Sequence, residues 1–138
     1  MMESHLPAEI RPVLDNGIPA AMVTCSADGV PNATVISQVY FVDDTHVALS
    51  FQFFNKTIRN VRENPRAYVT VHDIPGLSRW LLELEFERSE TEGPIFDAMD
   101  MQIEAIASVT GMSGIFKLRA SDIYRVISVE KQSYPPHA

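Results

Sequence analysis

The sequence offers little that could cross-link the chain or bind a metal through sulfur. Its only cysteine is Cys25, which excludes an internal disulfide and any Cys-x-x-Cys metal site. Cys25 lies in an apolar segment, so we expect a buried, unreactive thiol and a chain that resides in the cytoplasm. The four histidines are scattered and show no metal-ligand spacing, which predicts that no metal site is present.

Long apolar runs and an excess of positive charge are also lacking. No run of about 18 apolar residues occurs, so we expect no membrane span, and the first residues show no secretory signal pattern. The 11 Lys and Arg against 18 Asp and Glu give a net charge of −7. An acidic chain of this kind argues against nucleic acid as a partner. No Gly-x-Gly-x-x-Gly motif is present either.

What is present indicates one small domain. The 138 residues with 46% hydrophobic content suit a single core over 1–138. We expect a short or broken helix within 1–17, because Pro12 interrupts it, and a loose tail over 131–138. Helices are predicted from 55 to about 64 and from 94 to about 109, where Thr110-Gly111 ends the second. The predicted strands are 20–26, 32–42, 46–51, 67–72, 80–88, 115–118 and 123–129. Their number and length predict a small closed barrel of the α+β class.

The segment 80–88 alternates almost strictly between apolar and acidic residues. One face carries Trp80, Leu82, Leu84 and Phe86, and the other carries Leu81, Glu83, Glu85 and Glu87. This pattern predicts a half-buried antiparallel strand with a wet outer face. We interpret the three glutamates as a solvated face rather than an acid–base pair.

The helix predicted from residue 55 carries an unusual share of the positive charge. Four of the 11 cations fall between Lys56 and Arg66. Lys56 and Thr57 lie in the first turn, where free N–H groups and the helix dipole attract a phosphate. The alternative is that Arg59, Arg62 and Arg66 form only a solvated helix face.

This region resembles the FMN-binding split barrels, the superfamily of pyridoxamine 5′-phosphate oxidase. Their signature places a small hydroxyl residue on a strand, then a lysine, then Asn-Pro. Ser50, Lys56 and Asn64-Pro65 take those positions here, and the resemblance extends from Ile18 to Val129. It implies a small, mainly β, antiparallel split β-barrel of six to seven strands with two or three short helices. It also implies FMN as the cofactor.

The resemblance further implies a set of cofactor contacts. The backbone of 34–37 would line the flavin edge, the Ser50 and Gln52 side chains would lie near the phosphate or the ribityl chain, and Asn55 precedes the lysine. The expected FMN-binding residues are Thr34, Val35, Ile36, Ser37, Ser50, Gln52, Asn55, Lys56, Thr57 and Trp80.

Two of these positions depart from the family pattern. Thr34 replaces an arginine that often holds the phosphate, and Arg59 or Arg62 is the nearby cation that could compensate. Trp80 stands where the family often has a glutamine that touches the ring. It either covers the flavin or fills the core.

The substrate side differs from that of the true oxidases. Asp97 and Asp100 occupy the run in which those enzymes hold a substrate phosphate with arginines, so we expect no oxidation of pyridoxine phosphate. No catalytic residue can be named. The resemblance implies a homodimer with flavin at the subunit interface, to which the apolar cluster Phe51, Phe53 and Phe54 would contribute.

Several functions therefore remain open from the sequence. The first is an FMN-dependent oxidoreductase that acts on an unknown substrate. The second is a non-enzymatic flavin- or haem-binding sensor or dimerisation module, with His72 as a candidate haem ligand. The third is a structural barrel without a cofactor, and a deazaflavin could also replace FMN.

Overall fold

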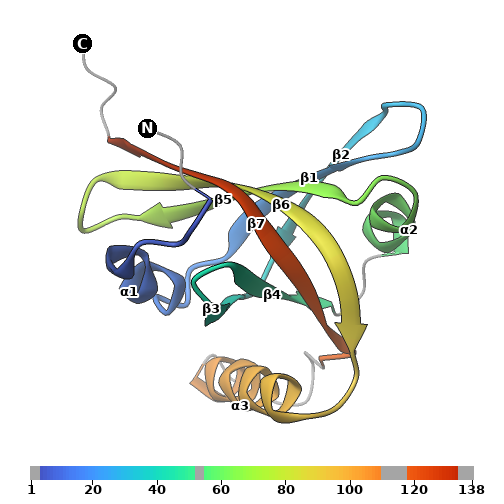
Figure 1. Ribbon diagram of the computed structural model, residues 1–138. Coiled ribbons are helices and arrows are strands. Elements are labelled where there is room, and N and C mark those ends of the chain that lie inside the picture. Colours follow the sequence, from blue (N-terminus) through green and yellow to red (C-terminus); the bar gives the residue numbers. More distant parts are fainter. Residues whose placement is uncertain (1–3, 52–54, 110–117, 134–138) are drawn as a thin grey trace.

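A computed structural model describes residues 4–51, 55–109 and 118–133 of the chain. Figure 1 shows the helices arranged around a strongly bent sheet. The helical elements are η1 (Ala8–Ile10), α1 (Arg11–Leu14), α2 (Asn55–Glu63) and α3 (Pro94–Val109). The strands are β1 (Ala20–Cys25), β2 (Pro31–Ile36), β3 (Val39–Asp43), β4 (His46–Phe51), β5 (Arg66–Asp73), β6 (Ser78–Glu90) and β7 (Ala120–Ser133).

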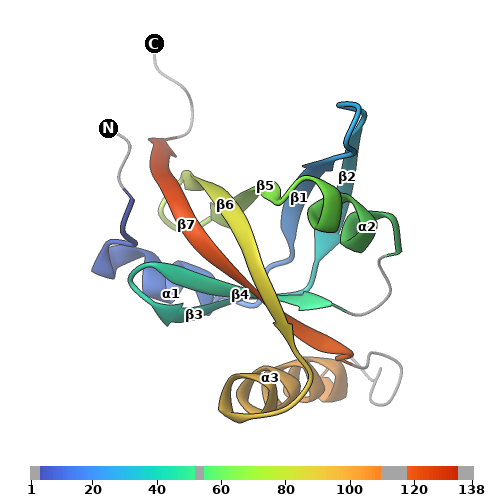
Figure 2. The same cartoon turned by 45° about the vertical axis from the view of Figure 1, so that its right-hand side comes forward.

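The seven strands form one antiparallel sheet in the order β2-β1-β5-β6-β7-β4-β3. The two end strands β2 and β3 do not pair with each other, so the barrel is split rather than closed. Figure 2 shows the β1–β2 and β3–β4 hairpins on different sides of the long β6–β7 pair. The split barrel implied by the resemblance is confirmed, and full closure is not.

The core follows the alternation read from the sequence. Trp80, Leu82 and Leu84 are buried on the inner face of β6, and they belong to the main apolar cluster. A smaller cluster lies where α3 packs against the opposite face of β4 and β7, and it consists of Ala48, Met99, Ile103, Leu118 and Ile123. Helix α3 is therefore attached through its own small core, separate from that of the barrel.

The strand predicted over 32–42 is wrong, because the structure has two strands there. The chain leaves β2 after Ile36, bends at Ser37 and Gln38, and enters β3 at Val39. β2 pairs with β1 whereas β3 pairs with β4, at opposite ends of the sheet. Gln38 and Val39 are both buried, which breaks the alternation that one continuous strand would require.

The other predicted elements differ in their ends. The N-terminal helix is short, as expected, with Pro12 in the first turn of α1. β7 runs to Ser133, which pairs with Ser78, so the chain stays ordered three residues into the predicted tail. Leu118 lies outside any strand. The rest of the predicted 115–118 strand, the Thr110-Gly111 stop and 134–138 fall outside the described residues.

Candidate functional site

Helix α2 is held against the β1–β2 hairpin by two hydrogen bonds between polar side chains. Asn60 Nδ2 donates to Thr24 Oγ1 at 3.1 Å, and both residues are buried. Asn32 Nδ2 donates to Thr57 Oγ1, also at 3.1 Å. Because Thr24 and Asn32 are cross-strand partners, the two bonds place the first turn of α2 beside β2.

The predicted residues of β2 divide between the two faces of the strand. Thr34 is half-buried on the same face as Asn32, because alternate residues of a strand share a face. Ile36 continues that face and is fully buried, whereas the Val35 side chain is exposed on the other face. Ser37 lies in the bend that follows. β2 pairs only with β1 among the described strands, so its outer edge keeps backbone groups available to a ligand.

The remaining predicted contacts lie at the end of β4 and the start of α2. Ser50 is buried, and its Oγ has no hydrogen-bond partner in the part of the chain that the structure describes. Thr57 is buried under the Asn32 amide. Asn55 and Lys56 are the first residues of α2, and the structure describes their backbone only. Gln52, like the predicted interface residues Phe53 and Phe54, is outside the described residues.

Trp80 lies on the inner face of β6. Its side chain is buried in the main core, and the Lys131 Nζ lies 5.4 Å from the centre of its ring. The strand order explains this placement, because Trp80 pairs with Val71 on one side and with Lys131 on the other.

The cations near α2 are not equivalent. Arg66 forms ion pairs with Glu83 and Glu85, so its charge is already neutralised. Arg59 and Arg62 are exposed, and neither forms an ion pair with another described residue. These two are therefore the arginines of the helix that can serve a bound anion.

A buried carboxyl near the end of the barrel was not anticipated from the sequence. Asp122 accepts a hydrogen bond from Ser89 Oγ at 2.6 Å. Burial raises the pKa of Asp122 to about 6, while the Ser89 hydrogen bond and the Arg62 charge act in the opposite direction. Burial also raises the pKa of the neighbouring Tyr124 phenol, and the Asp122 charge adds to that effect.

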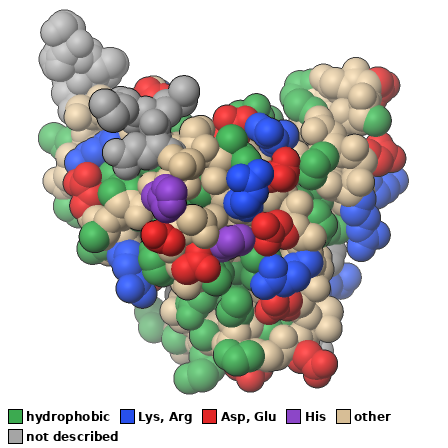
Figure 3. Space-filling model, viewed as in Figure 1, with side chains coloured by type: hydrophobic (Ala, Val, Ile, Leu, Met, Phe, Trp, Pro, Cys, Tyr) green, Lys and Arg blue, Asp and Glu red, His purple; other side chains and the backbone are tan. Residues whose placement is uncertain are grey.

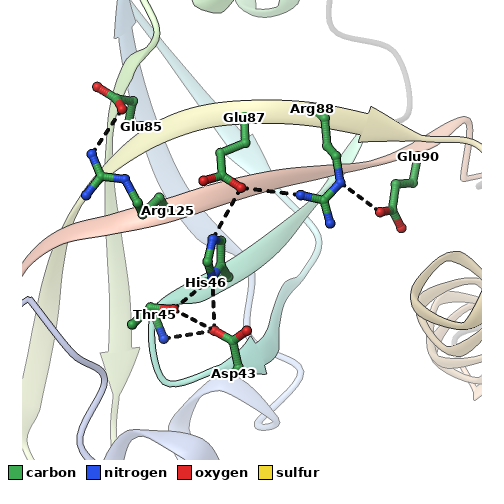
Figure 4. Close-up of polar contacts among 8 residues, drawn as sticks. All are labelled: Asp43, Thr45, His46, Glu85, Glu87, Arg88, Glu90 and Arg125. Carbon is green, nitrogen blue, oxygen red and sulfur yellow. Dashed lines mark hydrogen bonds and ion pairs between the residues drawn. The ribbon is translucent and has the colours of Figure 1, made fainter.

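The three alternating glutamates of β6, Glu83, Glu85 and Glu87, take part in ion pairs on the outer surface. Glu87 contacts His46 Nε2 at 3.2 Å and Arg88 at 3.3 Å, and Glu85 pairs with Arg125 (Figure 4). Figure 3 shows acidic and basic side chains alternating over the centre of this face. The interpretation of these carboxylates as surface charges agrees with this arrangement.

His46 is the most connected residue of this surface network. Its Nδ1 lies 3.0 Å from Asp43 Oδ1 and 2.8 Å from Thr45 Oγ1, so the imidazole links the β3–β4 turn to β6 (Figure 4). No group of three or more His, Cys, Asp or Glu side chains within the described ranges is arranged to hold a metal ion. No helix of the described chain is long and apolar enough to cross a membrane.

Comparison with known proteins agrees with the fold. The family model of pyridoxamine 5′-phosphate oxidase matches residues 6–127. No curated protein sequence matches the chain. An FMN-binding protein from Syntrophomonas wolfei subsp. wolfei has 17% identity and a TM-score of 0.70, over 91% of this chain and 89% of that one.

Two other solved structures share the fold. An F420 reductase has 13% identity and a TM-score of 0.66, over 91% of this chain and 98% of that one. HutZ, the haem storage protein from Vibrio cholerae, has 15% identity and a TM-score of 0.56, over 88% of each chain. The match of the family model over most of the length shows that this chain belongs to the pyridoxamine 5′-phosphate oxidase family.

Proposed function

We propose that the protein is an FMN-binding flavoprotein and that it acts as an oxidoreductase on a substrate other than pyridoxine phosphate. The phosphate would bind at the first turn of α2, which contains Lys56 and Thr57 and is joined to β2 by the Asn32–Thr57 hydrogen bond. The flavin edge would lie along the backbone of residues 34–37, that is, the end of the edge strand β2 and the bend that follows it. The flavin would supply the redox chemistry, and the protein would hold and orient it.

The observation that carries this proposal is the docking of α2 against β2. The Asn32–Thr57 hydrogen bond brings the positive end of the α2 dipole to the side of β2 that bears Thr34. Arg59 and Arg62 add positive charge on the same helix. The unpartnered Ser50 Oγ, one residue before the end of β4, is a polar group that a ligand hydroxyl or phosphate could satisfy.

The charges on helix α3 support the proposal that the substrate is not pyridoxine phosphate. Asp97 and Asp100 both lie on α3 and are exposed. No Lys or Arg occurs between Pro94 and Val109. A substrate phosphate would therefore meet negative charge on this helix.

The test is a visible absorption spectrum of the purified protein before and after addition of excess FMN and desalting. We expect the two flavin bands to survive desalting. Lys56→Ala should weaken FMN binding roughly 10- to 100-fold, because a charged hydrogen bond contributes about 1.5–3 kcal/mol. Lys131→Ala is the matched control, since Lys131 pairs with Glu9 away from α2, and it should bind FMN like the wild type.

Other outcomes assign other functions. A single sharp band near the blue edge of the visible range would indicate haem, as in the storage protein of the same fold. Bands that appear only with F420 would indicate a deazaflavin. A protein that stays colourless with all three cofactors would contradict the proposal.

We also propose that the protein is a homodimer with the flavin at the subunit interface. Members of the family are commonly dimeric. The outer face of the sheet presents Val35 and Tyr68, which are 64% and 50% exposed. A groove of about 290 Å³ continues this face, lined by residues that include Leu81 and Ser128. A second copy would cover these apolar side chains together with the edge strand β2.

A charge placed on this face is expected to separate the subunits. Tyr68→Lys should raise the dimer dissociation constant at least about 10-fold in sedimentation velocity, because two desolvated ammonium groups would enter the interface. Ile74→Lys is the control, since Ile74 is equally exposed but lies in the β5–β6 turn. A wild-type monomer, or equal effects of the two variants, would refute this interface.

A further inference from the structure

The bend between β2 and β3 borders a cavity of about 40 Å³. Asp15, Ser37, Gln38 and Gln102 form its polar lining, and Ile18 belongs to its apolar part. A bound water needs about 10–15 Å³ on the same measure, so the cavity admits a group the size of about three waters. This is the size of a functional group at one end of a ligand, not of a whole flavin.

Gln38 is a buried polar side chain of this lining, and one of its polar atoms has no partner among the described residues. It is 7% exposed, and its Nε2 donates to Gln102 Oε1 of α3. Its own Oε1 is buried and has no hydrogen-bond partner among the described residues. A buried carbonyl oxygen left without a donor is unfavourable and uncommon in native proteins. The cavity therefore offers an acceptor to a ligand that can donate a hydrogen bond.

The charges around the cavity also favour a ligand that donates a hydrogen bond and is not an anion. Its lining includes the Asp15 carboxylate and no Lys or Arg. Helix α3, which supplies Gln102, carries Asp97, Asp100 and Glu104 and no cation between Pro94 and Val109. A phosphate or carboxylate would find no counter-ion in this lining, whereas a neutral or cationic donor would be tolerated.

The position of the cavity relates it to the proposed cofactor site. Ser37 is the last residue of the 34–37 segment proposed to line the flavin edge, and it also borders the cavity. We propose that this cavity recognises the substrate and takes a primary amide, alcohol or ammonium group, with Gln38 as the acceptor. Gln102 is the residue that holds the Gln38 amide in place. The role of the cavity in a reaction depends on the proposed flavin function. Its preference for hydrogen-bond donors depends only on the residues that line it.

The test follows the side-chain amide signals of Gln38 and Gln102 by NMR of the ¹⁵N-labelled full chain. The two signals are identified from Gln38→Leu and Gln102→Leu. Acetamide and methylammonium are the donor probes, and acetate and inorganic phosphate are the anionic probes. We expect saturable shifts with acetamide at concentrations at least about ten times lower than with acetate.

Three variants test whether the Gln38 side chain itself binds the acetamide probe. Gln38→Leu should lower the acetamide affinity about 5- to 10-fold, the effect of one lost hydrogen bond. Gln102→Leu should lower the acetamide affinity as well. Because Gln102 is exposed, this variant provides the test if Gln38→Leu does not fold. Gln132→Leu is the control, because Gln132 binds Arg79 on β6 and lies outside the cavity.

Two results would overturn the proposal. One is equal or tighter binding of acetate or phosphate at the two glutamine signals. The other is the absence of any saturable shift with acetamide and methylammonium. FMN retention is measured on the same samples by absorbance. Donor binding without FMN would refute the flavin function alone, and FMN binding without donor binding would refute the cavity assignment alone.

Discussion

Met99→Ala is expected to lower the free energy of unfolding by about 2–5 kcal/mol, the range measured for methionine and leucine truncations in protein cores. Met99 is fully buried and is one of five buried residues in the cluster that attaches α3 to β4 and β7. So small a cluster has few neighbours that can move into the space left by the lost side chain. Urea unfolding followed by circular dichroism measures the change.

Met101→Ala is the matched control for this prediction. Met101 lies two residues further along the same helix and is 73% exposed, so its truncation should change stability by less than about 0.5 kcal/mol. Hydrogen exchange adds a second readout, since α3 amides should lose protection in Met99→Ala before those of β5 and β6 do. Equal effects of the two truncations would contradict the packing described for α3.

Asp122→Asn is expected to stabilise the protein at high pH and to have a much smaller effect at low pH. The folded pKa of about 6 lies above the usual 3.8, so the native state binds the Asp122 proton more tightly than the unfolded chain. The contribution of Asp122 to stability is therefore highest below pH 4 and falls as the pH rises to 6. The asparagine removes this loss and can still accept the Ser89 hydrogen bond.

The size of the effect follows from the two pKa values. A change from 3.8 to about 6 corresponds to roughly 3 kcal/mol. Urea unfolding should show that Asp122→Asn raises the free energy of unfolding more at pH 8 than at pH 4, by about this amount. Asp28 is the control of opposite sign, since its pKa is lowered by the Ser26 hydrogen bond. Asp28→Asn should therefore destabilise the protein more at pH 8 than at pH 4. If Asp122→Asn stabilised the protein equally at both pH values, the raised pKa of Asp122 would be refuted.

The elements that the sequence predicted well are those whose signals are local. The alternation over 80–88 arises because one face of β6 meets the core along most of its length. Helix α2 ends before Asn64-Pro65 for the reason seen in the sequence, since a proline cannot continue the helix. Both patterns depend on a few consecutive residues and not on partners elsewhere in the chain.

The features that were missed depend on distant partners. The alternation continues through Ser37 and Gln38, so nothing local shows that β2 and β3 pair at opposite ends of the sheet. The predicted last strand began at 123 because Ser and Asp are poor strand formers, and this placed Asp122 in a loop. Asn32 and Asn60 resemble ordinary surface residues until their partners Thr57 and Thr24 are brought against them.

The strand order also determines when the sheet can be completed during synthesis. The β1–β2 and β3–β4 hairpins come first along the chain, yet they lie at opposite ends of the sheet and are joined only through β5, β6 and β7. β4 has no partner besides β3 until residues 120–125 of β7 are available. The N-terminal half of a nascent chain therefore carries two hairpins with open edges, which must be protected from other chains until the last strand is made.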